Sequence, residues 1–253
     1  MIQLKNSLQI EKMKLAGRIT GEALLLAGEA IKEGVTTKYL DDIIRTYIEK
    51  CGATPTFLGY GGFPGSACIS INDQVIHGIP SKNVVLKEGD IVKIDVGATY
   101  RGFIGDSANT FPVGKISDEA SKLIQCTKES FYRGASAFKV GNRIGDIGAA
   151  VQSYCEEHGY GVVRKYTGHG VGRELHEDPS VPNYGTAGRG PRLVSGMTLA
   201  IEPMVTAGSY EVKELSDGWT VVTKDHSLTA HYEHTVALTD EGIIYLTRVD
   251  ESL

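Results

Sequence analysis

The sequence lacks the long hydrophobic runs that mark membrane proteins and secreted precursors. No apolar stretch in its 253 residues approaches the roughly 18 residues needed to cross a bilayer. The segment Met1–Lys14 spaces apolar and polar side chains as a helix does, without the apolar core and small-residue cleavage site of a signal peptide. We therefore expect a cytoplasmic protein with no membrane partner.

Cysteine is scarce, and no charge of one sign dominates. The net charge of -5 comes from 26 basic and 31 acidic residues that form no basic patch, which argues against DNA as a partner. None of the cysteines forms a Cys-x-x-Cys pair or has metal-ligand spacing, so we expect free thiols that pack in the core. The four are Cys51, Cys68, Cys126 and Cys155.

Several common catalytic motifs are also missing. There is no Gly-x-Ser-x-Gly turn of the kind that presents a serine nucleophile. There is no phosphate-binding Gly-x-x-x-x-Gly-Lys-[Ser/Thr] loop, and the glycines of 168–172 do not have the Gly-x-Gly-x-x-Gly spacing of a dinucleotide site. These absences argue against a serine hydrolase and against a nucleotide-binding enzyme.

Helical and strand patterns alternate along the chain, with no linker or low-complexity segment between them. Apolar spacing predicts helices over about 11–31, 37–51, 118–137 and 144–158. Glycines at 52 and 159 end the second and fourth. Strands are expected near 67–71, 91–96, 105–111, 198–205, 220–223 and 233–238. We expect one catalytic domain over 1–253.

The second half of the sequence repeats the first at a constant offset of 107 residues. The shift places Gly34, Leu40, Ile44, Tyr47 and Gly52 on Gly141, Ile147, Val151, Tyr154 and Gly159. It also carries Leu86, Gly89, Ile94 and Asp95 onto Leu193, Gly196, Ile201 and Glu202. A shared offset across a helix and a strand indicates an internal duplication, with halves at roughly 1–115 and 116–253. Asp95 and Glu202 would then be equivalent carboxylates ending two buried strands.

Acidic residues occur inside apolar strand sequences, where a charge is costly unless it is paired or bound to a cation. Asp95 lies in such a strand, and Asp106 follows eleven residues later, as if across a hairpin. Glu202 and Glu233 have similar apolar neighbours. His169 lies in Thr-Gly-His-Gly-Val-Gly, where glycines let the chain bend and a ligand approach. One such residue is usually structural, but the group indicates a metal site.

Charge and ligand type favour two divalent cations at this site. Four carboxylates supply a charge of -4, which two divalent ions balance. Oxygen ligands with one imidazole suit Co, Mn, Fe(II) or Zn and argue against a thiolate site. Two metals about 3.5 Å apart can share a water, lower its pKa and clamp a tetrahedral intermediate. The expected reaction class is hydrolysis at a carbonyl.

These residues and the segments around them resemble the pita-bread metallopeptidases, and most closely type I methionine aminopeptidases. The matching segments are Cys68–Asn72, His77–Pro80, Thr167–Gly172, Leu175–Glu177 and Ala200–Pro203. The resemblance covers nearly the whole chain, without the N-terminal extension and the insertion of the type II form. It implies an α+β pita-bread fold, in which two duplicated helix-and-antiparallel-sheet halves surround a central dimetal site.

The resemblance also implies how the metals are held. Asp95 would chelate one metal, while His169 and Glu202 hold the other. Asp106 and Glu233 would bridge both. Glu202 would in addition activate the bridging water and shuttle its proton.

Other residues receive roles in the same way. His77 would contact the scissile nitrogen or stabilise the intermediate, and His176 would polarise the substrate carbonyl, although the residues alone favour structural roles for both. The methionine pocket maps onto Phe57, Tyr60, Phe63, Cys68 and Trp219. Phenylalanine stands at 57 and 63, where some members carry cysteine and tyrosine, so the pocket stays apolar. A monovalent cation site (Na+ or K+) of some members maps onto Asn72, Gln74 and Thr229.

The implied activity is removal of the initiator methionine from nascent polypeptides whose second residue is small. Such a substrate also points to transient contact with the ribosome, and we expect a monomer. Two alternatives share the fold. Proline-specific aminopeptidases and dipeptidases usually carry a further N-terminal domain, whereas only residues 1–56 precede the pocket here. Non-catalytic pita-bread modules have lost metal ligands, whereas all five are present in this sequence.

Overall fold

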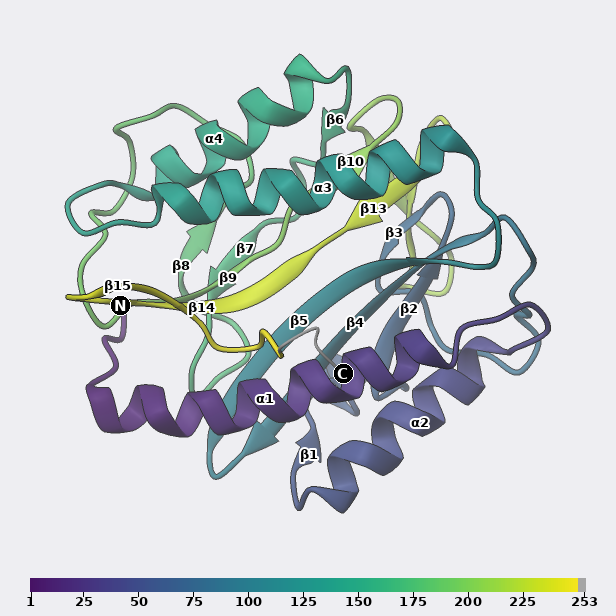
Figure 1. Ribbon diagram of the computed structural model, residues 1–253, viewed down its shortest axis with the longest axis horizontal. Coiled ribbons are helices and arrows are strands. Elements are labelled where there is room, and N and C mark those ends of the chain that lie inside the picture. Colours follow the sequence, from purple (N-terminus) through teal and green to yellow (C-terminus); the bar gives the residue numbers. More distant parts are fainter. Residues whose placement is uncertain (250–253) are drawn as a thin grey trace.

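The computed structural model describes residues 1–249, in which two pairs of helices lie against an antiparallel sheet (Figure 1). The helices are α1 (Ser7–Glu29), α2 (Thr37–Lys50), α3 (Asp118–Ala137) and α4 (Ile144–Glu157). A short 3-10 turn, η1, covers Tyr60–Gly62. The expected α+β class is confirmed.

The helix ends follow from local capping. Helix α1 begins at Ser7, earlier than the apolar spacing predicts, because Asn6 and Gln9 each accept a hydrogen bond from the other's backbone amide (both 2.9 Å). Helices α2 and α4 end shortly before Gly52 and Gly159, whose φ angles are 70° and 81°. Glycine adopts this left-handed backbone at little cost, so it ends a helix readily.

The central sheet has nine strands in the described chain, and their pairing is antiparallel throughout. The order is β1-β4-β5-β14-β9-β7-β8, with β2 on β4 and β15 on β14. The bounds are β1 Thr54–Pro55, β2 Ala67–Ile71, β4 Ile91–Tyr100, β5 Phe103–Pro112, β7 Gly168–Gly170, β8 Glu177–Val181, β9 Thr198–Ile201, β14 Glu233–Thr239 and β15 Gly242–Tyr245.

Two smaller sheets contain three strands each. In one, β10 (Met204–Thr206) lies between β13 (Thr229–His231) and β6 (Gly161–Val162). In the other, β12 (Val221–Thr223) lies between β11 (Val212–Glu214) and β3 (Gln74–Ile76).

The single strand expected over 198–205 is two strands. Strand β9 ends at Ile201 and pairs with β14 and β7, whereas β10 begins at Met204 and pairs with β13 and β6. Pro203 has no amide hydrogen to donate, so the ladder is interrupted there. Glu202 lies at the break, where the chain passes from one sheet to the other.

The two helix pairs cover apolar faces of the strands. Ile94 of β4 is buried in one cluster with Leu40 and Ile44 of α2. Because side chains alternate along a strand, Lys93 and Asp95 point to the opposite face. The cluster under α3 and α4 contains Phe131, Ile147, Leu199 and Val236. Among residues 1–249, no helix combines the length and the hydropathy needed to cross a bilayer.

The backbone supports the internal duplication expected from the sequence. Helices α2 and α4 begin at Thr37 and Ile144 and have the same length, so both of their ends lie 107 residues apart. Ahead of α2, the Gly34 amide donates to the Leu86 carbonyl (2.9 Å), and ahead of α4 the Gly141 amide donates to the Leu193 carbonyl (3.0 Å). Equivalent positions in the two halves therefore make equivalent hydrogen bonds.

Candidate metal centre

All of the residues expected to bind metal or methionine line one cavity of about 200 Å³. The expected metal ligands in its wall are Asp95, Asp106, His169, Glu202 and Glu233. The other expected residues are His77, His176, Phe57, Tyr60, Phe63, Cys68 and Trp219. Segments more than 150 residues apart in sequence thus contribute to one site.

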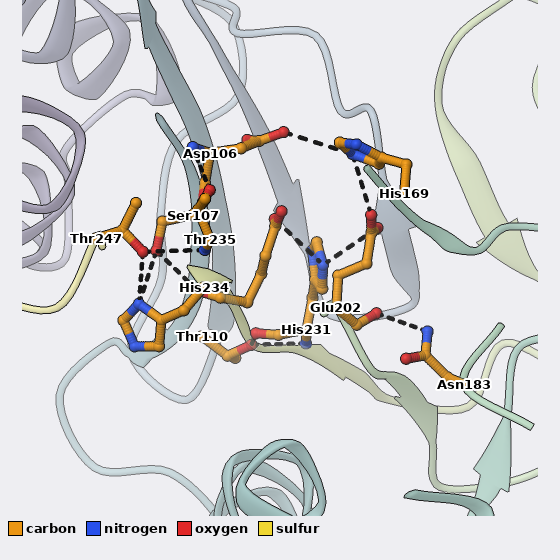
Figure 2. Close-up of polar contacts among 11 residues, drawn as sticks. Asp106, Ser107, Thr110, His169, Asn183, Glu202, His231, His234, Thr235 and Thr247 are labelled. Atoms are coloured by element: carbon orange, nitrogen blue, oxygen red, sulfur yellow. Dashed lines mark hydrogen bonds and ion pairs between the residues drawn. The ribbon is translucent and has the colours of Figure 1, made fainter. Parts of the chain in front are cut away.

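Strand pairing places the acidic residues side by side. On β4 and β5, Ala108 lies opposite Asp95, and on β14 it lies opposite Glu233. Thr235 ties β5 to β14, because its hydroxyl donates to the Asp106 carbonyl (2.8 Å) and accepts from the Asp106 amide (2.9 Å). These contacts fix three carboxylates on neighbouring strands, as Figure 2 shows for Asp106 and its neighbours.

His169 approaches the carboxylates from the other side of the cavity (Figure 2). It lies on β7, opposite Ala200 of β9. Its Nε2 atom is 3.6 Å from Asp106 Oδ2 and 3.4 Å from Glu202 Oε1. One ligand atom from each of Asp106, His169 and Glu233 falls within 4.8 Å of the others. This spacing suits the first coordination sphere of a metal ion.

Burial raises the pKa values of the acidic residues. Desolvation raises the pKa of Asp106 to about 7 and holds that of Asp95 well above its ordinary value. For Glu202 and Glu233, desolvation and then the charge of Asp106 raise the pKa strongly. The protein alone therefore does not stabilise four charged carboxylates here.

The polar atoms of the site fit a divalent metal. Within residues 1–249, Asp95 Oδ1, Asp106 Oδ1 and Glu233 Oε1 are buried without a hydrogen-bond partner. The ion-pair contacts of the described chain give these carboxylates histidine partners only, and no Lys or Arg. Buried anions without a cation are costly, so an oxygen-rich site of this kind suits a bound metal.

The histidines of the cavity are neutral near pH 7. Desolvation, with a smaller contribution from His176, lowers the pKa of both His77 and His169 to about 4. Desolvation also lowers the pKa of His176. His169 can therefore offer a lone pair to a metal, and the other two can each donate one N–H to a substrate.

Aromatic residues form the apolar part of the cavity. Trp219 lies edge-on to Phe63, with ring centroids 5.1 Å apart. His77 contacts both Trp219 (6.4 Å) and Tyr166 (5.8 Å) edge-on. The Tyr60 hydroxyl lies 2.8 Å from His176 Nδ1. The apolar wall is thus continuous with the two non-ligand histidines.

The sequence analysis missed five residues at or behind this site. Four line the cavity, and each directly precedes an assigned residue or its motif: Ile76, Tyr166, Thr167 and Leu175. The fifth, His231, is buried with its Nε2 3.8 Å from Glu202 Oε2 and 3.9 Å from Glu233 Oε2 (Figure 2). Adjacency to an assigned residue was a usable signal for the first four.

The residues matched to a monovalent cation site also lie together. The Asn72 carbonyl accepts hydrogen bonds from the Thr229 amide (3.1 Å) and from Nζ of Lys93 (2.7 Å). Gln74 Oε1 accepts from the Ile71 amide (2.9 Å). Lys93 is fully buried, and the sequence analysis did not anticipate its amine at this position.

Comparisons with known proteins agree with this geometry. The chain matches the model of metallopeptidase family M24 over residues 11–240. The methionine aminopeptidase of Clostridium acetobutylicum is 58% identical over 247 residues, which cover 98% of this chain and 99% of that protein. Methionine aminopeptidase 1 of Bacillus subtilis is 51% identical over 249 residues, 98% of this chain and 100% of that protein. The crystal structure of methionine aminopeptidase from Thermotoga maritima superposes with a TM-score of 0.97 at 45% identity, covering 98% of this chain and 100% of that one.

Proposed function

The chain belongs to metallopeptidase family M24, and we propose that its buried carboxylates and His169 hold the divalent metal on which this family depends. Its fold is the pita-bread fold of that family, and its activity is removal of an N-terminal methionine. The observation that supports the site is its composition, because the ligand set and the apolar pocket line one cavity.

We assign two cations to the centre. Asp95 binds one, His169 and Glu202 bind the other, and Asp106 and Glu233 bridge them. Support comes from the unpartnered carboxylate oxygens and from the balance between four carboxylates and two divalent charges. Mn, Fe(II), Co and Zn all accept this ligand set. When bound, such cations supply Lewis acidity and activate the attacking water.

The residues around the centre then divide the proton transfers. Glu202 accepts a proton from the attacking water and returns it to the leaving amine. His176 donates its N–H to the oxygen of the scissile carbonyl. His77 donates to the tetrahedral intermediate or contacts the scissile nitrogen. Support for both histidine roles comes from their neutral form and from their place in the same cavity wall.

The apolar wall selects methionine. Burying a methionine side chain contributes roughly 1.5–3 kcal/mol, which favours Met over Ala by about 10- to 150-fold. The second residue of the substrate lies against the metal centre, where a large side chain would displace the carbonyl from the attacking water. The substrates are therefore nascent polypeptides with a small second residue.

The cellular setting follows from such substrates. The protein acts as a monomer in the cytoplasm and contacts the ribosome transiently. A monovalent cation near Asn72, Gln74 and Thr229 is a finer part of the proposal. The unpartnered Thr229 hydroxyl supports it, whereas the Lys93 amine competes for the Asn72 carbonyl.

Three tripeptides test the substrate assignment. With Mn(II) or Co(II) present, we expect Met-Ala-Ser to be cleaved at least 10-fold more efficiently than Leu-Ala-Ser, because shape rejects a branched side chain only modestly (about 10- to 200-fold). Met-Lys-Ser should resist cleavage. The measurement is kcat/KM for release of the first residue. Comparable values for all three would make this a broad aminopeptidase, even with the metal centre intact.

A further inference from the structure

We propose that Tyr60 is a positioning residue, whose hydroxyl donates to His176 Nδ1 and so keeps the His176 proton on Nε2, available to the substrate carbonyl. This inference rests on the proposed role of His176. It gives Tyr60 a task beyond forming part of the methionine pocket.

Exposure separates Tyr60 from the other aromatic residues of the pocket. Phe57 and Phe63 are 7% and 4% exposed, as expected for walls that bury a methionine side chain. Tyr60 is 45% exposed, so its ring buries little apolar surface in the pocket. Its polar end, in contrast, makes a specific contact. The requirement at this position is therefore for the hydroxyl as well as for the ring.

The contact joins two distant segments at the cavity. Tyr60 OH lies 2.8 Å from Nδ1 of His176, a residue 116 positions later. The two ring centroids are 5.4 Å apart, and the planes are tilted by 49°. The His176 ring also packs edge-on against His169, a proposed metal ligand, at 4.3 Å. The hydroxyl therefore fixes a ring that lies directly beside the metal centre.

The backbone around Tyr60 favours this arrangement. Tyr60 begins the η1 turn, and the residues on both sides of it are Gly59 (φ 83°) and Gly61 (φ 56°). Side-chain-bearing residues rarely adopt such angles. A Cβ atom on Gly61 would also lie 3.4 Å from the Trp219 ring. Glycines thus let the turn carry Tyr60 towards His176 close to Trp219.

The chemistry of a neutral imidazole determines what the contact does. The ring has one N–H and one lone pair, so a partner at one nitrogen fixes the state of the other. With the Tyr60 hydroxyl donating to Nδ1, the proton must be on Nε2. The opposite tautomer would present a lone pair at Nε2, which cannot stabilise negative charge on a carbonyl oxygen. Tyr60 therefore selects the tautomer that can polarise the substrate.

The variant Tyr60→Phe tests the proposal because it keeps the ring and removes only the hydroxyl. We expect kcat for Met-Ala-Ser to fall about 10-fold, the value of one hydrogen bond of average strength, with KM changed less than 2-fold. In the metal-free protein, nitrogen-15 NMR of His176 should show one tautomer in the wild type and a mixture in the variant. The matched control is Tyr47→Phe, which loses a hydroxyl that binds Glu22 away from the cavity, and its kcat should not change.

A double-mutant cycle separates this inference from the role of His176. In a His176→Ala background, Tyr60→Phe should have no further effect on kcat, because the two residues act as a unit. An additive loss would overturn the proposal, as would a rise in KM at constant kcat or an unchanged tautomer in Tyr60→Phe. If His176→Ala keeps wild-type activity, the proposed role of His176 fails, and the tautomer measurement still decides whether Tyr60 fixes the ring.

Discussion

A buried carboxylate remains charged only where positive charge or hydrogen bonds compensate for the water it has lost. Asp106 is the clearest case here, because burial raises its pKa to about 7 and its Oδ1 atom has no partner among the described residues. Its other oxygen faces His169. A residue in this position can serve two cations at once, which is the role proposed for it.

Replacement of Asp106 by Asn tests that role. The change removes one negative charge from a balanced site, so the second metal should bind at least 10-fold more weakly and kcat should fall by orders of magnitude. Metal stoichiometry and affinity would be measured by calorimetry alongside peptide hydrolysis. The control is Asp240→Asn, the same chemical change at an exposed position. A stoichiometry of two with near wild-type activity at limiting metal would exclude a bridging Asp106.

Individual residues of the site differed in how well the sequence predicted them. The five proposed ligands could be found because each acidic residue interrupts an apolar strand and His169 lies among glycines. His231 and Lys93 could not be found in this way. Their importance depends on which strands become neighbours, since His231 lies behind Glu202 and Lys93 reaches the Asn72 carbonyl. A single sequence does not contain that register.

At the scale of secondary-structure elements, equivalent helices of the two halves begin differently. The Thr36 hydroxyl accepts a hydrogen bond from the Tyr39 amide (3.2 Å) at the start of α2. At the start of α4, Asp146 accepts from the Arg143 amide (2.7 Å), and the Arg143 side chain makes no cap. The helices have therefore kept their length and position while their caps have changed.

This difference predicts unequal effects of alanine at the two cap positions. Thr36→Ala should lower the free energy of unfolding by about 1 kcal/mol, because an amide at the helix start loses its acceptor. Arg143→Ala is the matched control and should change it by less than about 0.5 kcal/mol. Urea denaturation of the metal-loaded protein would measure both, and kcat should be unaffected. Equal losses at the two sites would show that the Thr36 hydroxyl does not cap α2.

Elements were predictable in proportion to their length. Helix α3 was predicted with its observed bounds, because apolar spacing persists over 118–137 and Ser117 caps it. Strands such as β7 and β13 have only three residues and escaped notice. Alternation of period two cannot be recognised over so few positions. Such strands exist because neighbouring strands supply their hydrogen bonds, which is a property of the assembled sheet.

At the scale of the whole molecule, we infer that the metal centre holds the two halves of a duplicated chain together. Asp95 and Asp106 come from the first half, whereas His169, Glu202 and Glu233 come from the second. The halves also share one sheet, because β5 pairs with β14. A metal bound across this boundary stabilises the folded chain by mass action, since the unfolded chain does not present the site.

That linkage should make metal-induced stabilisation depend on pH. In the metal-free protein the pKa of Asp106 is raised to about 7, so its favourable contribution to folding is complete at low pH and is lost as pH rises through about 7. A metal requires the ionised form, so it binds more tightly above that pH. His169 does not oppose this between pH 5.5 and 8, because its pKa is about 4 and the ring is already neutral.

The melting temperature with and without Mn(II) would measure this linkage. At about 100 times the dissociation constant, one metal contributes about 2.7 kcal/mol, which raises Tm by roughly 5–10 °C for a chain of this size. At pH 8 we expect a shift in that range, and at pH 5.5 we expect less than half of it. In Asp106→Asn the pH dependence should flatten, because the titrating ligand is gone. A metal-induced shift that is equal at both pH values, or larger at pH 5.5, would mean that the buried carboxylates do not bind the metal.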